Sequence, residues 1–222
     1  MPSPTELLTA TYRSLSEQVT DLRPEEAWQP TGCAGWAVLD LTLHLVDDAR
    51  RGLVALATPA DGPATSDAVA YWRAWQPTGA QDEDVAWRTR VRASVAGGLA
   101  ELSAVYAELV AAVTVLAHSA LLPGPAPSMR GVGSRRARLL LSTLAVEAAV
   151  HHLDLVARLD RPGPAPEALA EVRRVLEGLL DGPLPVGWDD ATAARRGTGR
   201  APLDDADRAA LGSSAERFPL FG

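Results

Sequence analysis

From Leu139 the chain reads Leu-Leu-Leu-Ser-Thr-Leu-Ala-Val-Glu147-Ala-Ala-Val-His151-His152-Leu-Asp154-Leu. The apolar composition predicts a buried helix, yet a carboxylate and two imidazoles lie within it. Residues four apart share one face of a helix, so Glu147 and His151 are expected to point the same way. A glutamate and a histidine on an apolar helix either bind a ligand or satisfy each other. The rest of the chain must distinguish these two interpretations.

Working outward, helical periodicity and capping signals predict an all-α protein. Ser3 and Pro4 are expected to begin the first helix. One long helix is expected to contain Val91 and Val95 in its apolar stripe and to bend or pack closely at Gly97. Loops are expected at 58–66 and 123–133. The predicted helices span 4–21, 37–57, 67–76, 83–118, 134–159, 165–181, 189–196 and 204–211.

Four of these helices are long and all lie within residues 1–160, which predicts an antiparallel four-helix bundle with one or two long connections. Residues 161–222 form a small, mostly helical C-terminal extension. This extension has too few apolar residues to fold alone, so we expect it to pack on the bundle or on a partner.

Composition narrows the possible functions. The 222 residues carry a net charge of −7 without a basic tail, which disfavours nucleic-acid binding. All 21 cationic residues are arginine, so no lysine Schiff base can form. We expect no membrane-spanning helix and no secretion signal. Cys33 is the single cysteine, and together these features predict a cytoplasmic protein.

His44 in the second predicted helix is the third candidate ligand beside Glu147 and His151. Helical bundles build metal sites from side chains on facing helices. Two imidazoles and one carboxylate suit Zn²⁺, and three protein ligands would leave coordination positions open for catalysis. The same donors also suit Fe²⁺, Ni²⁺ or Mn²⁺. The alternative is that Glu147 and His151 form an ordinary surface pair.

Neighbouring residues have simpler expected roles. His152 points about 100° away from His151 and is interpreted as a flanking residue. His118 is expected to cap a helix end or to lie on the surface. Asp154 either holds the His151 imidazole by a hydrogen bond, as an outer-shell group, or is solvated. Cys33 is interpreted as a small buried apolar residue rather than a ligand.

Three segments resemble the mycothiol-dependent maleylpyruvate isomerases, a family of the DinB-like metalloenzyme superfamily. The first segment opens the predicted second helix, the second contains Glu-x3-His followed by x2-Asp, and the third is in the tail. They read Cys33-Ala-Gly35-Trp36-Ala-Val38-Leu-Asp40-Leu-Thr-Leu-His44-Leu, then Val146-Glu147-Ala-Ala-Val-His151-His152-Leu-Asp154-Leu, then Gly187-Trp188-Asp189-Asp190 with Gly197-Thr-Gly-Arg200 and Leu211-Gly212.

The resemblance implies a DinB-like four-helix bundle with a divalent metal, most often zinc, bound by His44, Glu147 and His151. It implies mycothiol as the cofactor and an actinobacterial source. The implied reaction is isomerisation or S-transfer on a small electrophilic substrate, through a metal-bound thiolate. A non-catalytic binding or sequestering bundle and a metal-free partner-binding bundle are the alternatives.

An anionic substrate would require cations nearby. Arg73 and Arg200 are the candidates for binding it, and the alternative is that either arginine is a surface or packing residue.

The expected partners are a small-molecule thiol and a small electrophile, with no nucleic acid and no membrane. The sequence leaves monomer and homodimer open.

Overall fold

The computed structural model describes residues 2–58, 67–75, 79–120 and 130–221, without the side chains of 79–83 and 130–135. The regular structure in these ranges is helical, apart from an isolated bridge between Pro30 and Ala37. Nine α-helices are seen there: α1 Pro4–Thr20, α2 Val38–Ala57, α3 Ala68–Ala74, α4 Gly79–Ala93, α5 Leu99–Ala120, α6 Arg130–Val156, α7 Pro166–Leu180, α8 Asp190–Gly197 and α9 Asp205–Leu211. Two short 3₁₀ helices are η1 Pro24–Glu26 and η2 Gly212–Arg217. The all-α prediction is therefore confirmed.

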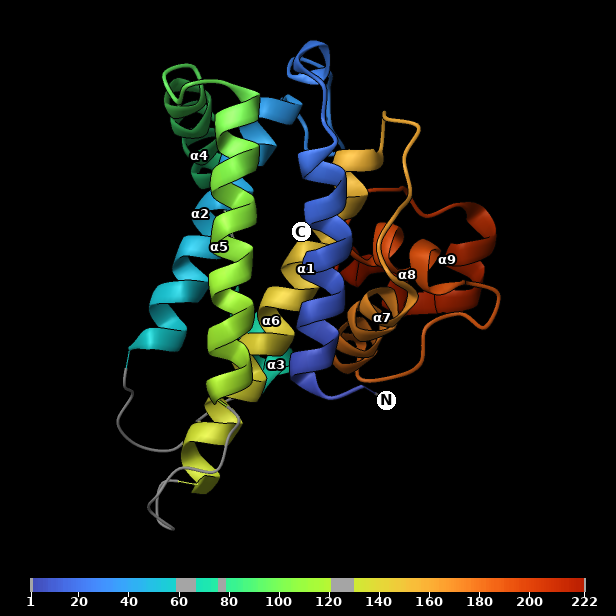
Figure 1. The fold of residues 1–222 in the computed structure, drawn as a ribbon. Coiled ribbons are helices and arrows are strands. Elements are labelled where there is room, and N and C mark those ends of the chain that lie inside the picture. Colours follow the sequence, from blue (N-terminus) through green and yellow to red (C-terminus); the bar gives the residue numbers. More distant parts are fainter. Residues whose placement is uncertain (1, 59–66, 76–78, 121–129, 222) are drawn as a thin grey trace.

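Helices α1, α2, α5 and α6 form the bundle (Figure 1). Helices α1 and α6 run in one direction, and α2 and α5 run in the other. Helix α2 packs against α5 and α6, and α1 packs against α5 and α6. Because α2 and the next bundle helix, α5, run in the same direction, the chain must return along the bundle between them. This long connection contains α3 and α4. One hydrophobic core, which contains buried side chains of all four helices, fills the bundle.

Local hydrogen bonds explain where the first two helices begin. Ser3 Oγ accepts from the N–H of Glu6, and the Glu6 carboxylate accepts from the N–H of Ser3, a reciprocal capping box ahead of Pro4. At the start of α2, the Asp40 carboxylate accepts from the N–H of Ala37 at 2.8 Å. Asp40 also receives two hydrogen bonds from Nε of Arg90, which ties α4 to this end of α2.

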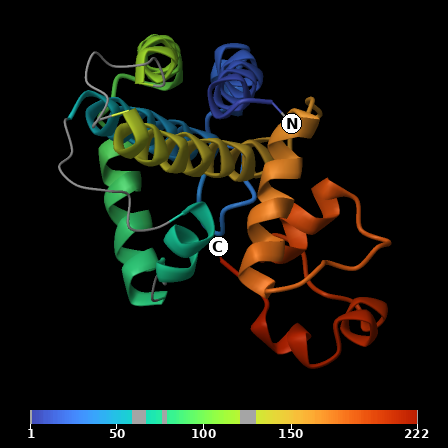
Figure 2. The same cartoon turned by 90° about the horizontal axis from the view of Figure 1, so that it is seen from below.

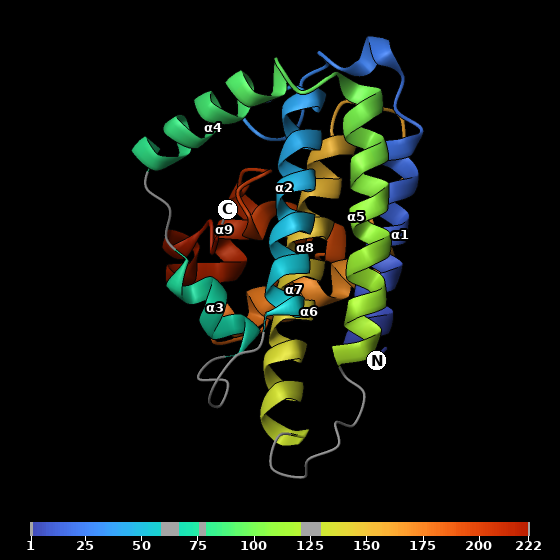
Figure 3. The ribbon, with the colours of Figure 1, turned by 60° about the vertical axis from the view of Figure 1, so that its left-hand side comes forward.

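The prediction of one helix over 83–118 is wrong, because the chain breaks between α4 and α5. Gly97 and Gly98 have φ of 71° and 96°, the left-handed region that favours glycine. Helix α4 then leans away from α5 over the side of the molecule (Figure 3). Val91 and Val95, which were expected in a buried stripe, are exposed on the α4 side of this break.

Helices α7, α8 and α9 lie on one side of the bundle (Figures 1 and 2). Helix α7 packs against α6 and α1, and a second hydrophobic core joins α6 to α3 and to the tail. Trp72 of α3 stacks on Phe221 with ring centroids 4.5 Å apart. Residues after 160 therefore cover a face of α6. The domain boundary near residue 160 stays a prediction.

Two helical stretches, Leu99–Ala120 and Arg136–Val156, are long and apolar enough to cross a membrane by length and composition. Of the second window, 72% is buried inside the bundle, so core packing accounts for its composition. The first window is 33% buried and packs on α1 and α2 through one face.

The remaining helices agree with the predicted spans within a few residues. Helix α6 begins at Arg130, inside the predicted loop 123–133, and the rest of that loop lies outside the described residues. The predicted loop 58–66 also lies outside them, except for Thr58.

Candidate metal centre

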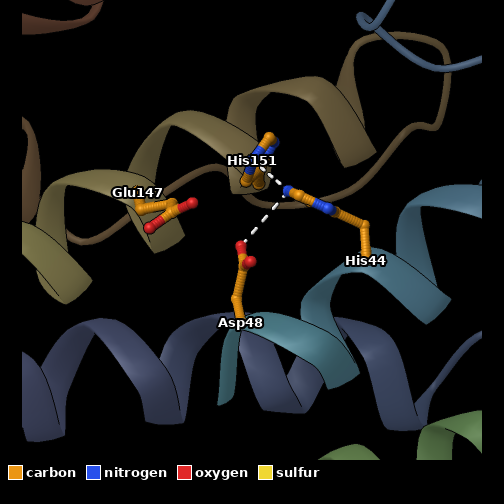
Figure 4. Close-up of side chains that lie close together, drawn as sticks. All are labelled: His44, Asp48, Glu147 and His151. Carbon is orange, nitrogen blue, oxygen red and sulfur yellow. Dashed lines mark hydrogen bonds and ion pairs between the residues drawn. The ribbon is translucent and has the colours of Figure 1, made fainter. Parts of the chain in front are cut away.

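Four potential ligands meet between α2 and α6 (Figure 4). Helix α2 contributes His44 and Asp48, and α6 contributes Glu147 and His151. Each pair is four residues apart, so both members share one face of their helix. Because α2 packs against α6, the two pairs face each other across the bundle. One ligand atom from each side chain lies within 4.8 Å of the other three.

The two imidazoles approach each other through the nitrogens that would bind a metal. His44 Nε2 lies 3.1 Å from His151 Nε2 and 3.3 Å from Oδ2 of Asp48. The two imidazole planes are inclined at 83°. Burial lowers the pKa of His44 well below its usual value, and the charges of His151 and Arg51 lower it further. His44 is therefore neutral at pH 7, as a metal ligand must be.

Asp154 contacts the other ring nitrogen of His151, the one that does not face His44. Its Oδ2 lies 3.1 Å from Nδ1 of His151, and the carboxylate is fully buried. Arg200 donates to both carboxylate oxygens at 3.0 Å. Although burial raises the pKa of Asp154, the hydrogen bond to His151 and the charge of Arg200 lower it well below its usual range. The ionised carboxylate thus orients the ring so that Nε2 faces the cluster.

The loop before α2 closes against this carboxylate. The N–H of Gly32 donates to the backbone carbonyl of Asp154 at 2.8 Å, and a Cβ at Gly32 would lie 2.6 Å from Oδ1 of Asp154. The absence of a side chain at Gly32 therefore permits this approach. Cys33 follows, with its Sγ 3.1 Å from Oδ2 of Asp154. Cys33 is half-buried and contacts a carboxylate, so the sequence interpretation of a purely apolar residue was incomplete.

Cys33, His151 and Asp154 form a second group with metal-ligand donors. This group is the weaker candidate for two reasons. Burial and the Asp154 charge raise the pKa of the Cys33 thiol, which stays protonated at pH 7. Arg200 already compensates the Asp154 carboxylate, so a cation there would lie beside a guanidinium. The group formed by His44, Asp48, Glu147 and His151 contains no thiol, and the arginine side chain beside it, that of Arg51, is 62% exposed whereas that of Arg200 is 17% exposed. We call this group the four-residue cluster.

A small cavity lies beneath the four-residue cluster, where α1 and α5 approach α2 and α6. It is lined by Asp48 and Glu147 together with Tyr12, Leu45, Tyr106, Leu144 and Ala148. Among the described residues, neither Oδ2 of Asp48 nor the hydroxyl of Tyr106 has a hydrogen-bond partner, although both atoms are buried. Oδ2 of Asp48 lies 3.3 Å from Nε2 of His44, a nitrogen that could itself bind a metal, and a cation between the two atoms would give both a partner. The donors present therefore fit a divalent metal.

A comparison with family models identifies the family of this chain. The model for the mycothiol maleylpyruvate isomerase N-terminal domain matches residues 8–156. The chain belongs to this family. The matched segment contains the four-residue cluster and Asp154, whereas Arg200 lies beyond its end. No match is found among curated proteins or solved structures.

The other predicted residues have different surroundings. Arg73 on α3 donates to the Gly178 carbonyl and to Asp181, which ties it to the end of α7. His118 is exposed and its Nδ1 contacts the Thr114 carbonyl. His152 is fully buried, and its Nε2 lies 3.1 Å from the Pro162 carbonyl. Binding of a substrate anion by Arg73 or Arg200 stays a prediction.

Two residues of the site were not singled out from the sequence. Asp48 repeats the four-residue interval of Glu147 and His151, and this spacing was the available signal. Arg51 contacts Asp48 and lies 3.9 Å from Oε1 of Glu147. Its position one turn after Asp48 was the only indication in the sequence.

Proposed function

We propose that the chain is a metal-dependent enzyme that uses the thiol mycothiol and acts on a small electrophilic substrate, as an isomerase or an S-transferase. The observation that carries the proposal is the convergence of four ligand atoms within 4.8 Å in a member of this family. The proposed ligands are His44, Glu147 and His151, with Asp48 beside them. Zinc is the proposed metal, and Fe²⁺, Ni²⁺ and Mn²⁺ suit the same donors.

Some of these residues would bind the metal, and others orient the residues that bind it. His44 and His151 would bind the metal through their Nε2 atoms, and the carboxylates of Asp48 and Glu147 would supply oxygen ligands. Asp154 fixes the orientation of His151, and Arg200 holds Asp154. When bound, a divalent cation stabilises the thiolate form of a thiol, which is the reactive nucleophile. Cys33 keeps its proton and is not the proposed nucleophile.

The same proposal places the protein in the cytoplasm, where a small thiol and a small electrophile are its partners. Nucleic acid and membrane are not among the proposed partners, and the protein acts as a monomer or a homodimer. A metal-binding protein that holds a ligand without turning it over is the alternative function.

The test combines metal analysis with product analysis. Wild-type protein, His151→Ala and His118→Ala are incubated with zinc, mycothiol and maleylpyruvate or other small electrophiles. We expect wild type and the exposed control His118→Ala to retain zinc and yield an isomer or a thioether adduct. His151→Ala should lose both zinc and product. Mycothiol binding by calorimetry without any product would favour the non-catalytic alternative, and unchanged zinc content in His151→Ala would contradict the ligand assignment.

A further inference from the structure

Arg51 approaches the four-residue cluster from the solvent side. It lies three residues after Asp48 on α2, where its Nη2 pairs with Oδ1 of Asp48 and lies 3.9 Å from Oε1 of Glu147. The Arg51 side chain is 62% exposed, whereas those of Asp48 and Glu147 are 9% and 24% exposed. One guanidinium therefore contacts both carboxylates of the cluster while most of its surface faces water.

Three other arginines have partners of a different kind: Arg200 and Arg73, which were considered for anion binding, and Arg50. Arg200 is 17% exposed and donates to both oxygens of Asp154 and to the Thr198 carbonyl. Arg73 is tied to α7. Arg50, the immediate neighbour of Arg51, pairs with Asp47 at 3.7 Å. Among the described residues, the contacts named here for these three arginines are to groups outside the four-residue cluster.

A tyrosine of α3 lies near the same charges. Tyr71 is 41% exposed. Burial and the Glu147 charge raise the pKa of its hydroxyl, while the Arg51 charge lowers it. Tyr71, Arg51 and Glu147 come from three different helices, so α3 contributes to the surroundings of this side of the cluster.

We infer that Arg51 is the anion-binding residue of this site, an inference that rests on the proposed metal-dependent function. Without a cation, Arg51 compensates Asp48 and Glu147. When a divalent cation binds the two carboxylates, it replaces Arg51 as their partner. The guanidinium keeps its positive charge, because arginine does not deprotonate, and then requires a new anionic partner. The Arg51 side chain is 62% exposed, so water solvates the guanidinium once the cation has replaced it beside the buried Asp48 carboxylate. The expected ligand carries a carboxylate a few ångströms from its thiol or reacting carbon.

The first experiment measures competition between Arg51 and the metal. Zinc affinity is measured by calorimetry for wild type, Arg51→Gln and the matched control Arg50→Gln. Arg51→Gln should bind zinc about three- to tenfold more tightly, because a competing and repelling positive charge is gone. Arg50→Gln should match wild type. Equal zinc affinity in all three would overturn the Arg51 inference alone, whereas no zinc binding in any of them would contradict the metal centre and the inference together.

The second experiment tests the anion itself. Cobalt-substituted protein is mixed with 3-mercaptopropionate, which carries a carboxylate, or with 2-mercaptoethanol, which carries a neutral hydroxyl. The thiolate-to-cobalt absorption band reports binding. Wild type and Arg50→Gln should prefer 3-mercaptopropionate by about three- to tenfold, and Arg51→Gln should lose this preference.

The outcomes separate the two proposals. The same preference in wild type and Arg51→Gln, or none in wild type, would overturn the anion-binding role. No absorption band with either thiol would instead contradict thiol binding at the metal, which belongs to the proposed function. The zinc comparison would then still decide whether Arg51 competes for the carboxylates.

Discussion

Asp48 follows His44 by four residues, the interval that also separates Glu147 from His151. The two pairs face each other, and Oδ2 of Asp48 is buried and makes no hydrogen bond among the described residues, with Nε2 of His44 3.3 Å away. Such an oxygen is costly in a metal-free protein and useful in a metal-bound one. Asp48 is therefore the most informative residue that the ligand prediction lacked.

Asp48→Asn should weaken zinc binding by about tenfold or more, because the amide keeps the shape of the side chain but removes its charge. Asp47→Asn is the matched control, since Asp47 pairs with Arg92 and Arg50 instead. Its zinc affinity should equal that of wild type. Calorimetry with zinc measures both variants, and an equal loss in both would show a general charge effect in place of a role for Asp48.

That Glu147 and His151 share one face of a helix could be predicted from the sequence, because helical spacing is a local property. The structure brings His44 and Asp48 to them, and the role of these residues as metal ligands stays a prediction. Asp48 was harder to predict, because the polar stripe on α2 also contains Asp40 and Asp47. The structure shows that Arg90 and Arg92 bind those two carboxylates. Neither arginine is close to α2 in sequence, so spacing alone could not separate the carboxylate that faces α6 from the two that face α4.

At the scale of elements, the break between α4 and α5 depends on backbone conformation. An apolar stripe continues through Gly97 and Gly98, and a helical pattern does not reveal a positive φ. The sequence therefore predicted one helix where the structure has two. As a consequence, α4 packs beside α2, where Arg90 binds the Asp40 carboxylate at the start of the helix that contributes His44.

Gly98→Ala should destabilise the protein by about 1–2 kcal/mol, because alanine is strained at a φ of 96°. The Cβ would meet open space, so backbone strain is the expected cause rather than a clash. Gly163→Ala is the control, with open space and no positive φ, and should change the free energy of unfolding by less than about 0.5 kcal/mol. Urea unfolding compares them, and equal effects would contradict the backbone explanation.

A buried ion pair between Glu26 and Arg161 stabilises the segment between α1 and α2. Glu26 in η1 accepts from Arg161 at 2.8 Å and from the N–H of Arg23 at 2.7 Å. Burial raises the pKa of Glu26, but these hydrogen bonds outweigh it and lower the pKa from 4.5 to about 2. As the pH falls, Glu26 is protonated in the unfolded chain at a higher pH than in the folded protein. The stabilisation is therefore complete above pH 4.5 and is lost as the pH falls toward 2.

Glu26→Gln should therefore cost about 2–3 kcal/mol at pH 7, and the difference from wild type should shrink steadily between pH 4.5 and pH 2. Glu25→Gln is the control because Glu25 is exposed and pairs only loosely with Arg23, at 3.6 Å. Urea unfolding at pH 7, 4 and 3 gives the comparison. A difference between Glu26→Gln and wild type that does not change with pH would contradict the assigned ion pair.

At the scale of the whole molecule, the site depends on parts of the chain that are distant in sequence. Asp154 contacts Arg200 across 46 positions and Cys33 across 121 positions. The sequence left Asp154 open between a hydrogen-bonded and a solvated role, and these contacts could not be read from spacing. The C-terminal extension thus supplies the group that holds the carboxylate behind His151.

This dependence predicts that the extension and the bundle unfold together. Phe221→Ala should lower stability by about 2–3 kcal/mol, since Phe221 is buried and stacks on Trp72. Val186→Ala, at a fully exposed position, should have no effect. Circular dichroism and tryptophan fluorescence should show one shared transition in each protein. Two separate transitions would contradict the coupling.

The proposed function requires a divalent metal between α2 and α6. Anomalous diffraction at the zinc edge, measured on crystals grown with zinc, would locate that metal. It should show one peak bounded by Nε2 of His44, Nε2 of His151 and the carboxylates of Asp48 and Glu147. A peak on the Asp154 side of His151, or no peak within reach of His151, would contradict it.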